Sequence, residues 1–297
     1  MENMENILEI QGLNKVYQDF ALKNVSFALP RGYIMGFVGQ NGSGKTTTIR
    51  SILNMAHIDS GKIAVFGLDS VTDTVAIKER LGIVFDSLYL AEHLNAKQIE
   101  KQLKPFYKEW SSEEYAKRLE EFELPDNRPV GDFSKGMKMK LMIAVALSHN
   151  AELMILDEPT SGLDPVARDE LLDILAEYIE NENRGVLFST HITADVERIA
   201  DYVTILHNGR VWFTGTKDEL TEKYVVLKGA EKDLPDAVKE KSIGFHAYRN
   251  GFEALLPKAL VPDLPEELEY EKASIDEILV YIAKEDKHER NQKDHAC

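Results

Sequence analysis

The stretch Gly39-Gln-Asn-Gly-Ser-Gly-Lys-Thr46 decides the fold. The apolar segment 33–38 before it has the composition of a buried strand, and the segment 47–54 after it has apolar residues at helical spacing. In this setting the glycines let the backbone turn its N–H groups around phosphate oxygens, and the helix start favours negative charge. We therefore predict a phosphate-binding loop in which Lys45 reaches the β- and γ-phosphates and the Thr46 hydroxyl binds Mg²⁺. The alternative, a glycine turn with a surface lysine, is disfavoured because every fixed position and both flanks fit the pattern.

The composition indicates a globular protein with room for one large domain or two modest ones. The chain has 297 residues, of which 43% are hydrophobic. No apolar run approaches the ~20 residues that a membrane-spanning helix needs, and the polar, acidic start Met1-Glu-Asn-Met-Glu-Asn6 argues against a signal peptide. Cys297 is the only cysteine, so we expect no intrachain disulfide, as in reduced cytosolic proteins. The net charge of -16 disfavours non-specific nucleic-acid binding.

Two carboxylates follow the apolar strand predicted at 153–156. Asp157 and Glu158 stand at its C-terminal end, the edge at which parallel sheets bind ligands. We expect Asp157 to hold Mg²⁺, directly or through water, and Glu158 to act as general base on an attacking water. Ordinary solvated loop charges are the weaker alternative, given the strand before them. His191, just beyond the strand predicted at 185–190, can contact the γ-phosphate, although a lone histidine is more often structural.

Further signals are weak when each is taken alone. Ser134 and Gly136 precede the helix predicted at 138–148; a serine–glycine turn at a helix start can bind an anion, but serine is also a common helix cap. Tyr17 lies shortly before the phosphate loop, where an aromatic ring can stack on adenine; a core or hairpin tyrosine fits its spacing equally well. Asp164 is expected to cap a helix with proline in its first turn.

The order of these elements over residues 7–220 resembles the nucleotide-binding subunit of an ABC transporter. In that resemblance 39–47 is Walker A, 153–157 is Walker B, and 161–164 is similar to the D-loop. Glu158 matches the catalytic glutamate and His191 the switch histidine. The residues that the resemblance assigns to ATP are Tyr17, Gly39, Asn41, Gly42, Ser43, Gly44, Lys45, Thr46, Thr47, Ser134, Gly136 and Asp164. Those that it assigns to the metal are Thr46, Asp86 and Asp157.

Two positions depart from the family pattern. Asp86 stands where the family usually has glutamine, at the end of a strand; an aspartate is shorter and charged but is still an oxygen ligand for Mg²⁺. The signature reads Phe133-Ser-Lys-Gly-Met137 instead of leucine-serine-glycine-glycine-glutamine. The serine and one glycine remain for contact with the γ-phosphate. Lys135 either adds charge there or points to solvent.

The resemblance implies an α/β P-loop NTPase fold with a parallel core sheet, an antiparallel β subdomain and a helical subdomain at about 88–150. It implies ATP and Mg²⁺ as cofactors and a head-to-tail dimer, homo or hetero, in which each ATP lies between Walker A of one subunit and Ser134 and Gly136 of the other. It also implies a transmembrane subunit seated near Asp86 to His93, at the cytoplasmic face of the membrane. No nucleic-acid partner is expected, given the acidic net charge. The signature and tail resemble exporters of antimicrobial or cytolytic peptides of the bacitracin and phenol-soluble modulin types.

Beyond residue 220 the ABC pattern stops. We expect a small α+β accessory domain over 221–285, with a hairpin about Asn250-Gly251 and a helix from Ile275 to Ala283. A charged tail over 286–297 follows, with fraying from Lys284 onward.

The main alternative function is a soluble ABC protein that acts on ribosomes or DNA. Such proteins usually carry two cassettes or a long coiled coil between the two Walker motifs. Here Lys45 and Asp157 lie too close in sequence for such a coil, and the acidic charge also argues against this function. A degenerate, purely structural cassette is disfavoured because Lys45, Asp157, Glu158 and His191 are all present.

Overall fold

The computed structural model describes residues 5–86, 89–230, 241–249, 251–263 and 268–294. The chain forms two compact units, Met1–Thr214 and Gly215–Cys297. The sequence pattern places the boundary a few residues later, after residue 220. Within the described residues, no helix combines the length and the apolar composition needed to cross a membrane.

The first unit is built on a six-stranded core sheet. The strand order is β10 (Arg210–Thr216), β9 (Tyr202–His207), β3 (Ile34–Val38), β8 (Gly185–Thr190), β7 (Leu153–Asp157) and β6 (Leu81–Val84). Strands β9, β3, β8, β7 and β6 pair in parallel. Every residue of β3, β7 and β8 is buried, as expected for parallel strands covered on both faces.

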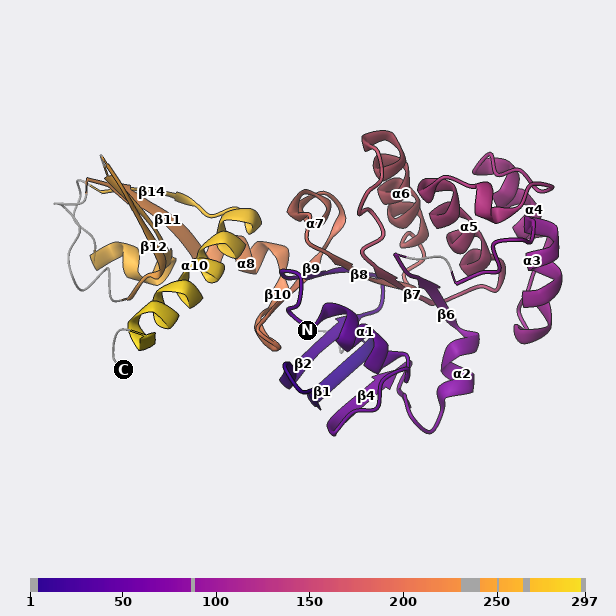
Figure 1. Ribbon diagram of the computed structural model, residues 1–297, viewed down its shortest axis with the longest axis horizontal. Coiled ribbons are helices and arrows are strands. Elements are labelled where there is room, and N and C mark those ends of the chain that lie inside the picture. Colours follow the sequence, from indigo (N-terminus) through magenta and orange to yellow (C-terminus); the bar gives the residue numbers. More distant parts are fainter. Residues whose placement is uncertain (1–4, 87–88, 231–240, 250, 264–267, 295–297) are drawn as a thin grey trace. The chain divides into compact units, whose positions relative to one another are not determined.

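A second, antiparallel sheet packs with the first helix against the core sheet. Its order is β2 (Ala21–Pro30), β1 (Asn6–Val16), β4 (Ser60–Val65) and β5 (Leu68–Asp69). One apolar cluster joins this sheet, α1 (Lys45–Ile52) and the core strands, with Ile10, Ile49 and Phe37 among its members. In Figure 1, α6 (Pro165–Tyr178) and α7 (Thr193–Ile199) cover the opposite face of the core sheet.

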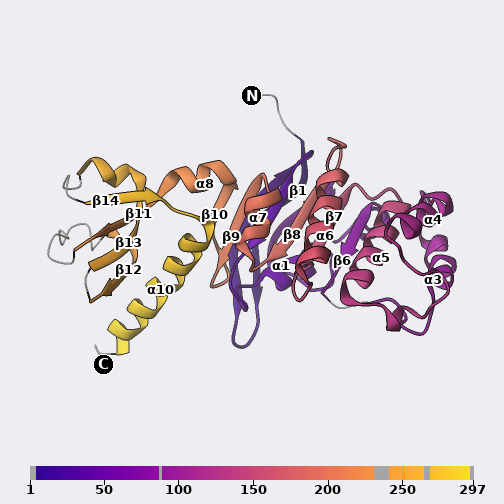
Figure 2. The ribbon, with the colours of Figure 1, turned by 90° about the horizontal axis from the view of Figure 1, so that it is seen from above.

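The remaining helices of this unit gather at one edge of the core sheet. α3 (Ala96–Leu103), α4 (Ser112–Glu121) and α5 (Lys135–Ser148) lie together beyond β6 in Figures 1 and 2, with α2 (Thr74–Glu79) leading into that strand. Short 3-10 turns at Lys104–Phe106 and Val130–Asp132 connect them. The expected start of α5 at residue 138 is wrong: the helix begins at Lys135, because the Ser134 hydroxyl accepts a hydrogen bond from Met137 N and caps it.

The second unit is a separate α+β domain. Its antiparallel sheet has the order β12 (Ile243–Tyr248), β13 (Gly251–Pro257), β11 (Tyr224–Gly229) and β14 (Glu269–Lys272), with α8 (Lys217–Lys223), a 3-10 turn (Lys258–Asp263) and α10 (Ile275–Asp294). Of the predicted hairpin turn, Asn250 lies outside the described residues. The expected end of this helix at Ala283 is wrong: α10 continues to Asp294 through a stretch rich in lysine, glutamate and arginine, which favour helix. The fraying expected from Lys284 stays a prediction. The predicted fold class is confirmed.

Candidate nucleotide-binding site

Four neighbouring parallel strands bring the predicted site residues to one edge of the core sheet. The phosphate loop follows β3, His191 follows β8, Glu158 follows β7 and Asp86 lies just beyond β6. Because β3, β8, β7 and β6 are adjacent in this order, their C-terminal ends share one edge. Residues far apart in the sequence are thereby placed around a common space.

The phosphate loop requires glycine at two of its positions. Gly44, the residue before α1, has φ +113°, and a Cβ there would lie 2.6 Å from the Leu22 side chain. At Gly39 a Cβ would lie 2.3 Å from the Leu206 carbonyl oxygen. Both distances are shorter than any real Cβ contact, so larger side chains would displace the loop from its neighbours.

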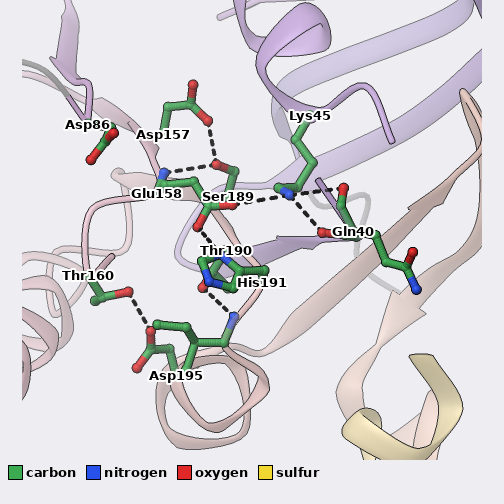
Figure 3. Close-up of polar contacts among 12 residues, drawn as sticks. Gln40, Lys45, Asp86, Asp157, Glu158, Thr160, Ser189, Thr190, His191 and Asp195 are labelled. Atoms are coloured by element: carbon green, nitrogen blue, oxygen red, sulfur yellow. Dashed lines mark hydrogen bonds and ion pairs between the residues drawn. The ribbon is translucent and has the colours of Figure 1, made fainter. Parts of the chain in front are cut away.

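Lys45 is the first residue of α1 and is 5% exposed. Its ammonium group donates a hydrogen bond to the Gly39 carbonyl (2.7 Å) and lies 3.1 Å from Glu158 Oε1 (Figure 3). A buried ammonium needs such partners. The loop thus holds the Lys45 ammonium group over its own centre. There the phosphate oxygens of a nucleotide can replace the Glu158 carboxylate as its partner.

Glu158 is held from two sides. Its backbone N–H lies 3.0 Å from the Ser189 hydroxyl and 3.1 Å from the Ser189 carbonyl, and its φ of +51° is in the left-handed region, a strained conformation for glutamate. His191 Nδ1 donates a hydrogen bond of 2.6 Å to Glu158 Oε2 (Figure 3). Because an ionised carboxylate only accepts, Nδ1 carries the proton, and Nε2 of a neutral ring remains an acceptor.

Ser189 is a site residue that the sequence analysis missed. Its hydroxyl donates to Asp157 Oδ1 at 2.6 Å and accepts from Glu158 N at 3.0 Å, so one buried side chain contacts the carboxylate of Asp157 and the backbone of Glu158. The signal was available in the strand pairing: Asp157 and Ser189 are direct partners between β7 and β8. Finding it required the register, which the sequence pattern does not specify.

The loop borders a cavity of about 410 Å³. The residues that line it are Asp19, Phe20, Gln40, Asn41, Gly42, Gly44, Lys45, Thr46, Thr47 and Glu158. Asp19, Phe20 and Gln40 were not predicted. The Ser43 hydroxyl is buried without a hydrogen-bond partner among the described residues, as is suitable for a group that awaits a polar ligand. The Thr46 hydroxyl and the Asp157 carboxylate are oxygen ligands of the kind that Mg²⁺ accepts beside phosphate, so these residues fit a magnesium nucleotide.

Tyr17 is not among the residues that line this cavity. Its side chain is 46% exposed, and the Lys15 ammonium lies 5.2 Å from its ring centroid. Phe20, three residues later, borders the cavity instead. The stacking role of Tyr17 therefore stays a prediction.

The other predicted residues lie on separate elements. Ser134 caps α5, and Asp164 caps α6 by accepting hydrogen bonds from Val166 N and Ala167 N, at 3.0 and 3.1 Å. Gly136 lies where α5 approaches α6: a Cβ there would be 3.2 Å from the Ala167 side chain. The Asp86 carboxylate forms an ion pair with Lys135. In the described part of the chain, none of these residues borders the cavity next to Lys45.

Known proteins with the same arrangement are numerous. The family model described as ABC transporter matches residues 22–161. The ABC transporter ATP-binding protein NatA of Bacillus subtilis is 34% identical over 218 residues, which cover 68% of this chain and 84% of NatA. The chain belongs to the ABC transporter ATP-binding proteins.

Further comparisons agree with this assignment. The bacitracin transport ATP-binding protein BcrA of Bacillus licheniformis is 30% identical over 252 residues, 82% of each chain. A solved structure of the ATP-binding subunit of an ABC transporter superposes with a TM-score of 0.66 at 34% identity, covering 72% of this chain and 91% of that one. This ABC protein is accordingly an ATP-binding subunit of an ABC transporter and an ATPase, and the ribosome or DNA alternative is not supported.

Proposed function

We propose that this ABC subunit works as one half of a head-to-tail dimer, homo or hetero, that binds two Mg²⁺–ATP complexes and drives export of an antimicrobial peptide or a similar hydrophobic toxin. Export passes through a separate transmembrane subunit, with the dimer at the cytoplasmic face of the membrane. Likeness to the bacitracin transport ATP-binding protein supports the substrate class. No nucleic-acid partner is expected, given the net charge of -16.

One observation supports the proposed dimer: the proposed catalytic groups and the helix cap at Ser134 lie on different surfaces. Lys45, Glu158 and His191 are joined by contacts within a single chain. Ser134 is exposed at the start of α5 and does not border their cavity. A helix start with a free face attracts an anion. A second subunit supplies that cap most simply by placing its Ser134 and Gly136 over the nucleotide, with Asp164 near the same interface.

The hydrolytic roles follow from the contacts of Glu158. Oε2 is oriented by His191, whose Nε2 points away from that contact and is free to accept a proton or a hydrogen bond from water. Oε1 is neutralised by Lys45. When Lys45 turns to phosphate oxygens, Oε1 becomes available to take a proton from water, which is general-base catalysis. Thr46, Asp157 and Asp86 would hold Mg²⁺, whose chemistry is to polarise the phosphate oxygens.

A surface for the membrane subunit is proposed between Asp86 and His93, of which residues 87–88 lie outside the described part. An apolar cavity of about 170 Å³ adjoins this segment, with a lining that consists of Ile83, Phe85, Tyr89, Leu90, Leu103, Tyr107, Met142, Val145, Ala146 and His149. Burial lowers the pKa of His149, which stacks on Tyr107 with ring centroids 3.9 Å apart. A largely apolar, aromatic cavity suits an apolar helix end from the membrane subunit.

Two experiments test this function. Glu158→Gln keeps the size of the side chain but removes the base, so turnover should fall by about 10²- to 10⁴-fold while ATP binding persists and dimers accumulate. ATPase assays and light scattering of the purified variant measure both. Turnover at the normal rate would contradict the general-base role.

For the transport role, the tagged chain is recovered from a detergent extract of its own cells. We expect a polytopic membrane protein in stoichiometric amount, and recovery without any membrane protein in repeated extractions would contradict the proposal. Loss of that protein with a charge reversal of Glu92, which lies in the proposed contact segment, would locate the surface.

A further inference from the structure

The start of α5 carries positive charge where a helix favours negative charge. The first turn contains Lys135 and Lys138 and no acidic residue. The N-terminal end of a helix has a partial positive charge, so lysines there are unfavourable unless anions neutralise them. The two lysines therefore need partners.

Both lysines find their partners in the segment proposed for the membrane subunit. Lys135 forms an ion pair with Asp86, 49 residues earlier, and Lys138 Nζ lies 3.1 Å from Glu92 Oε1. Backbone hydrogen bonds from Gly131 N to Glu92 O and from Val130 N to Leu94 O, both 2.8 Å, join the same two segments. The signature turn and the segment after β6 are thus tied together.

We propose that Lys135 contacts the phosphates of ATP bound to the opposite subunit and that Asp86 is its counter-ion only in the nucleotide-free subunit. Closure of the dimer then exchanges a carboxylate for a phosphate on the same ammonium group. The exchange frees Asp86 to serve as an oxygen ligand in its own site. It also removes one of the two ion pairs that hold the segment after β6 against α5, which links ATP binding to the surface for the membrane subunit.

Three features favour the exchange. The side chains of Lys135 and Asp86 are 36% and 58% exposed, so solvent weakens their attraction and lowers the cost of separation. Lys135 directly follows Ser134, whose helix cap is the proposed anion contact, so the two residues stand together at one helix start. A Cβ at Gly162 would lie 3.7 Å from Lys135 Nζ, which places the ammonium beside the turn that precedes Asp164, itself expected at the dimer interface.

The inference rests on the proposed composite dimer, and the test separates the two. All variants are made in the Glu158→Gln chain, and the dimer dissociation constant is measured by sedimentation with Mg²⁺ and ATP at saturation. Lys135→Gln should weaken the dimer about tenfold for each composite site, hence about a hundredfold for a homodimer, as expected for the loss of a charge-assisted contact. Lys135→Arg should restore most of the affinity. Lys140→Gln, which removes an ion pair with Glu170 on α6, is the matched control and should change little.

A double-mutant cycle tests the exchange itself. Asp86→Asn removes the counter-ion of Lys135 in the nucleotide-free subunit, so it should raise the dimer affinity when Lys135 is present. This gain should be about two- to fivefold larger per site than the gain from the same substitution in the Lys135→Gln background. Any contribution of Asp86 to Mg²⁺ binding is common to both backgrounds and cancels in the cycle.

The outcomes are distinct. If the parent Glu158→Gln chain dimerises with ATP neither with itself nor with a second ATP-binding subunit recovered from its own cells, or if Ser134→Ala leaves the dimer unchanged, the composite site is wrong and this inference is wrong with it. If the parent dimerises through Ser134 but Lys135→Gln has no effect, only the phosphate contact of Lys135 is overturned. If Lys135→Gln weakens the dimer but the cycle is additive, Asp86 does not compete for the lysine.

Discussion

At the scale of single residues, very few side chains hold Asp157 and Glu158 in place. Ser189 is fully buried and bonds both Asp157 and Glu158. Ser189→Ala should lower kcat about tenfold, because the Asp157 carboxylate and the Glu158 backbone N–H each lose an orienting hydrogen bond of roughly 1 kcal/mol. Steady-state ATPase assays measure this. Ser148→Ala removes another buried serine hydroxyl, one bonded to the Ala144 carbonyl within α5, and should leave kcat unchanged. Equal effects of the two substitutions would contradict the role of Ser189.

Much of the site could be predicted from single residues and their neighbours in sequence. The part that could not be predicted was missed for a physical reason. Lys45 and Glu158 follow short apolar strands, so local pattern alone predicted where they stand. Ser189 depended on strand register, and the ion pair of Lys135 with Asp86 joins residues 49 apart. A local sequence pattern predicts neither the pairing of Asp157 with Ser189 nor the ion pair of Lys135 with Asp86. The two departures from the family pattern, at Asp86 and in the signature, were therefore predicted separately, without their pairing.

At the scale of elements, a buried carboxylate joins α6, α7 and the turn after β7. Asp195 is fully buried; it accepts a hydrogen bond from Thr160 Oγ1 at 2.6 Å and forms an ion pair with Arg168 (Figure 3 labels Thr160 and Asp195). Asp195→Ala leaves Arg168 without its partner, and we expect a loss of about 3 kcal/mol in the free energy of unfolding. Urea unfolding measures it.

The control for this substitution is an exposed arginine on the same helix. Arg198 pairs with Asp169 and Asp173, whose side chains are more than half exposed. Arg198→Ala should cost less than about 1 kcal/mol. A loss at Asp195 no larger than the loss at Arg198 would show that burial does not strengthen the Asp195 network.

A second element-scale prediction concerns pH. The Arg80 guanidinium, and then Arg31, hold the pKa of Glu152 below its usual range, and they join the starts of β6, β7 and β3. A carboxyl group with a lowered folded pKa stabilises above the unfolded pKa, and this contribution is lost as pH falls through the folded value. Glu152→Gln should cost about 1 kcal/mol at pH 7, a value discounted for partial exposure, and progressively less below about pH 4. A difference from the parent that grows on acidification would contradict the assignment.

Element boundaries were less predictable than element types. The strands at β3, β7 and β8 were expected from their apolar runs, and they are present. The early start of α5 and the length of α10 were not, because a cap shifts a helix end by a few residues and helix propensity extends a charged segment beyond its apolar stripe.

At the scale of the whole molecule, the second unit has a core of its own. Val225, Leu227, Phe252, Ala254 and Leu256 form a cluster that belongs to its sheet. Among the described residues, every one that lines the nucleotide cavity belongs to the first unit. A chain of residues 1–216 should therefore fold and bind ATP with a Kd within about twofold of the full chain, as expected of separate domains. Calorimetry measures the Kd, and circular dichroism reports the folding. Loss of ATP binding by a folded fragment would show that the second unit contributes to the site.

The central claim is that ATP is bound between two chains, and the structure of the Glu158→Gln variant with Mg²⁺ and ATP tests it most directly. The measured quantity is the distance from Ser134 Oγ to the nearest γ-phosphate oxygen. The account predicts a hydrogen bond of about 3 Å to the nucleotide held by Lys45 of the opposite chain. A Ser134 hydroxyl more than about 10 Å from every triphosphate, far beyond the reach of a hydrogen bond, would contradict it.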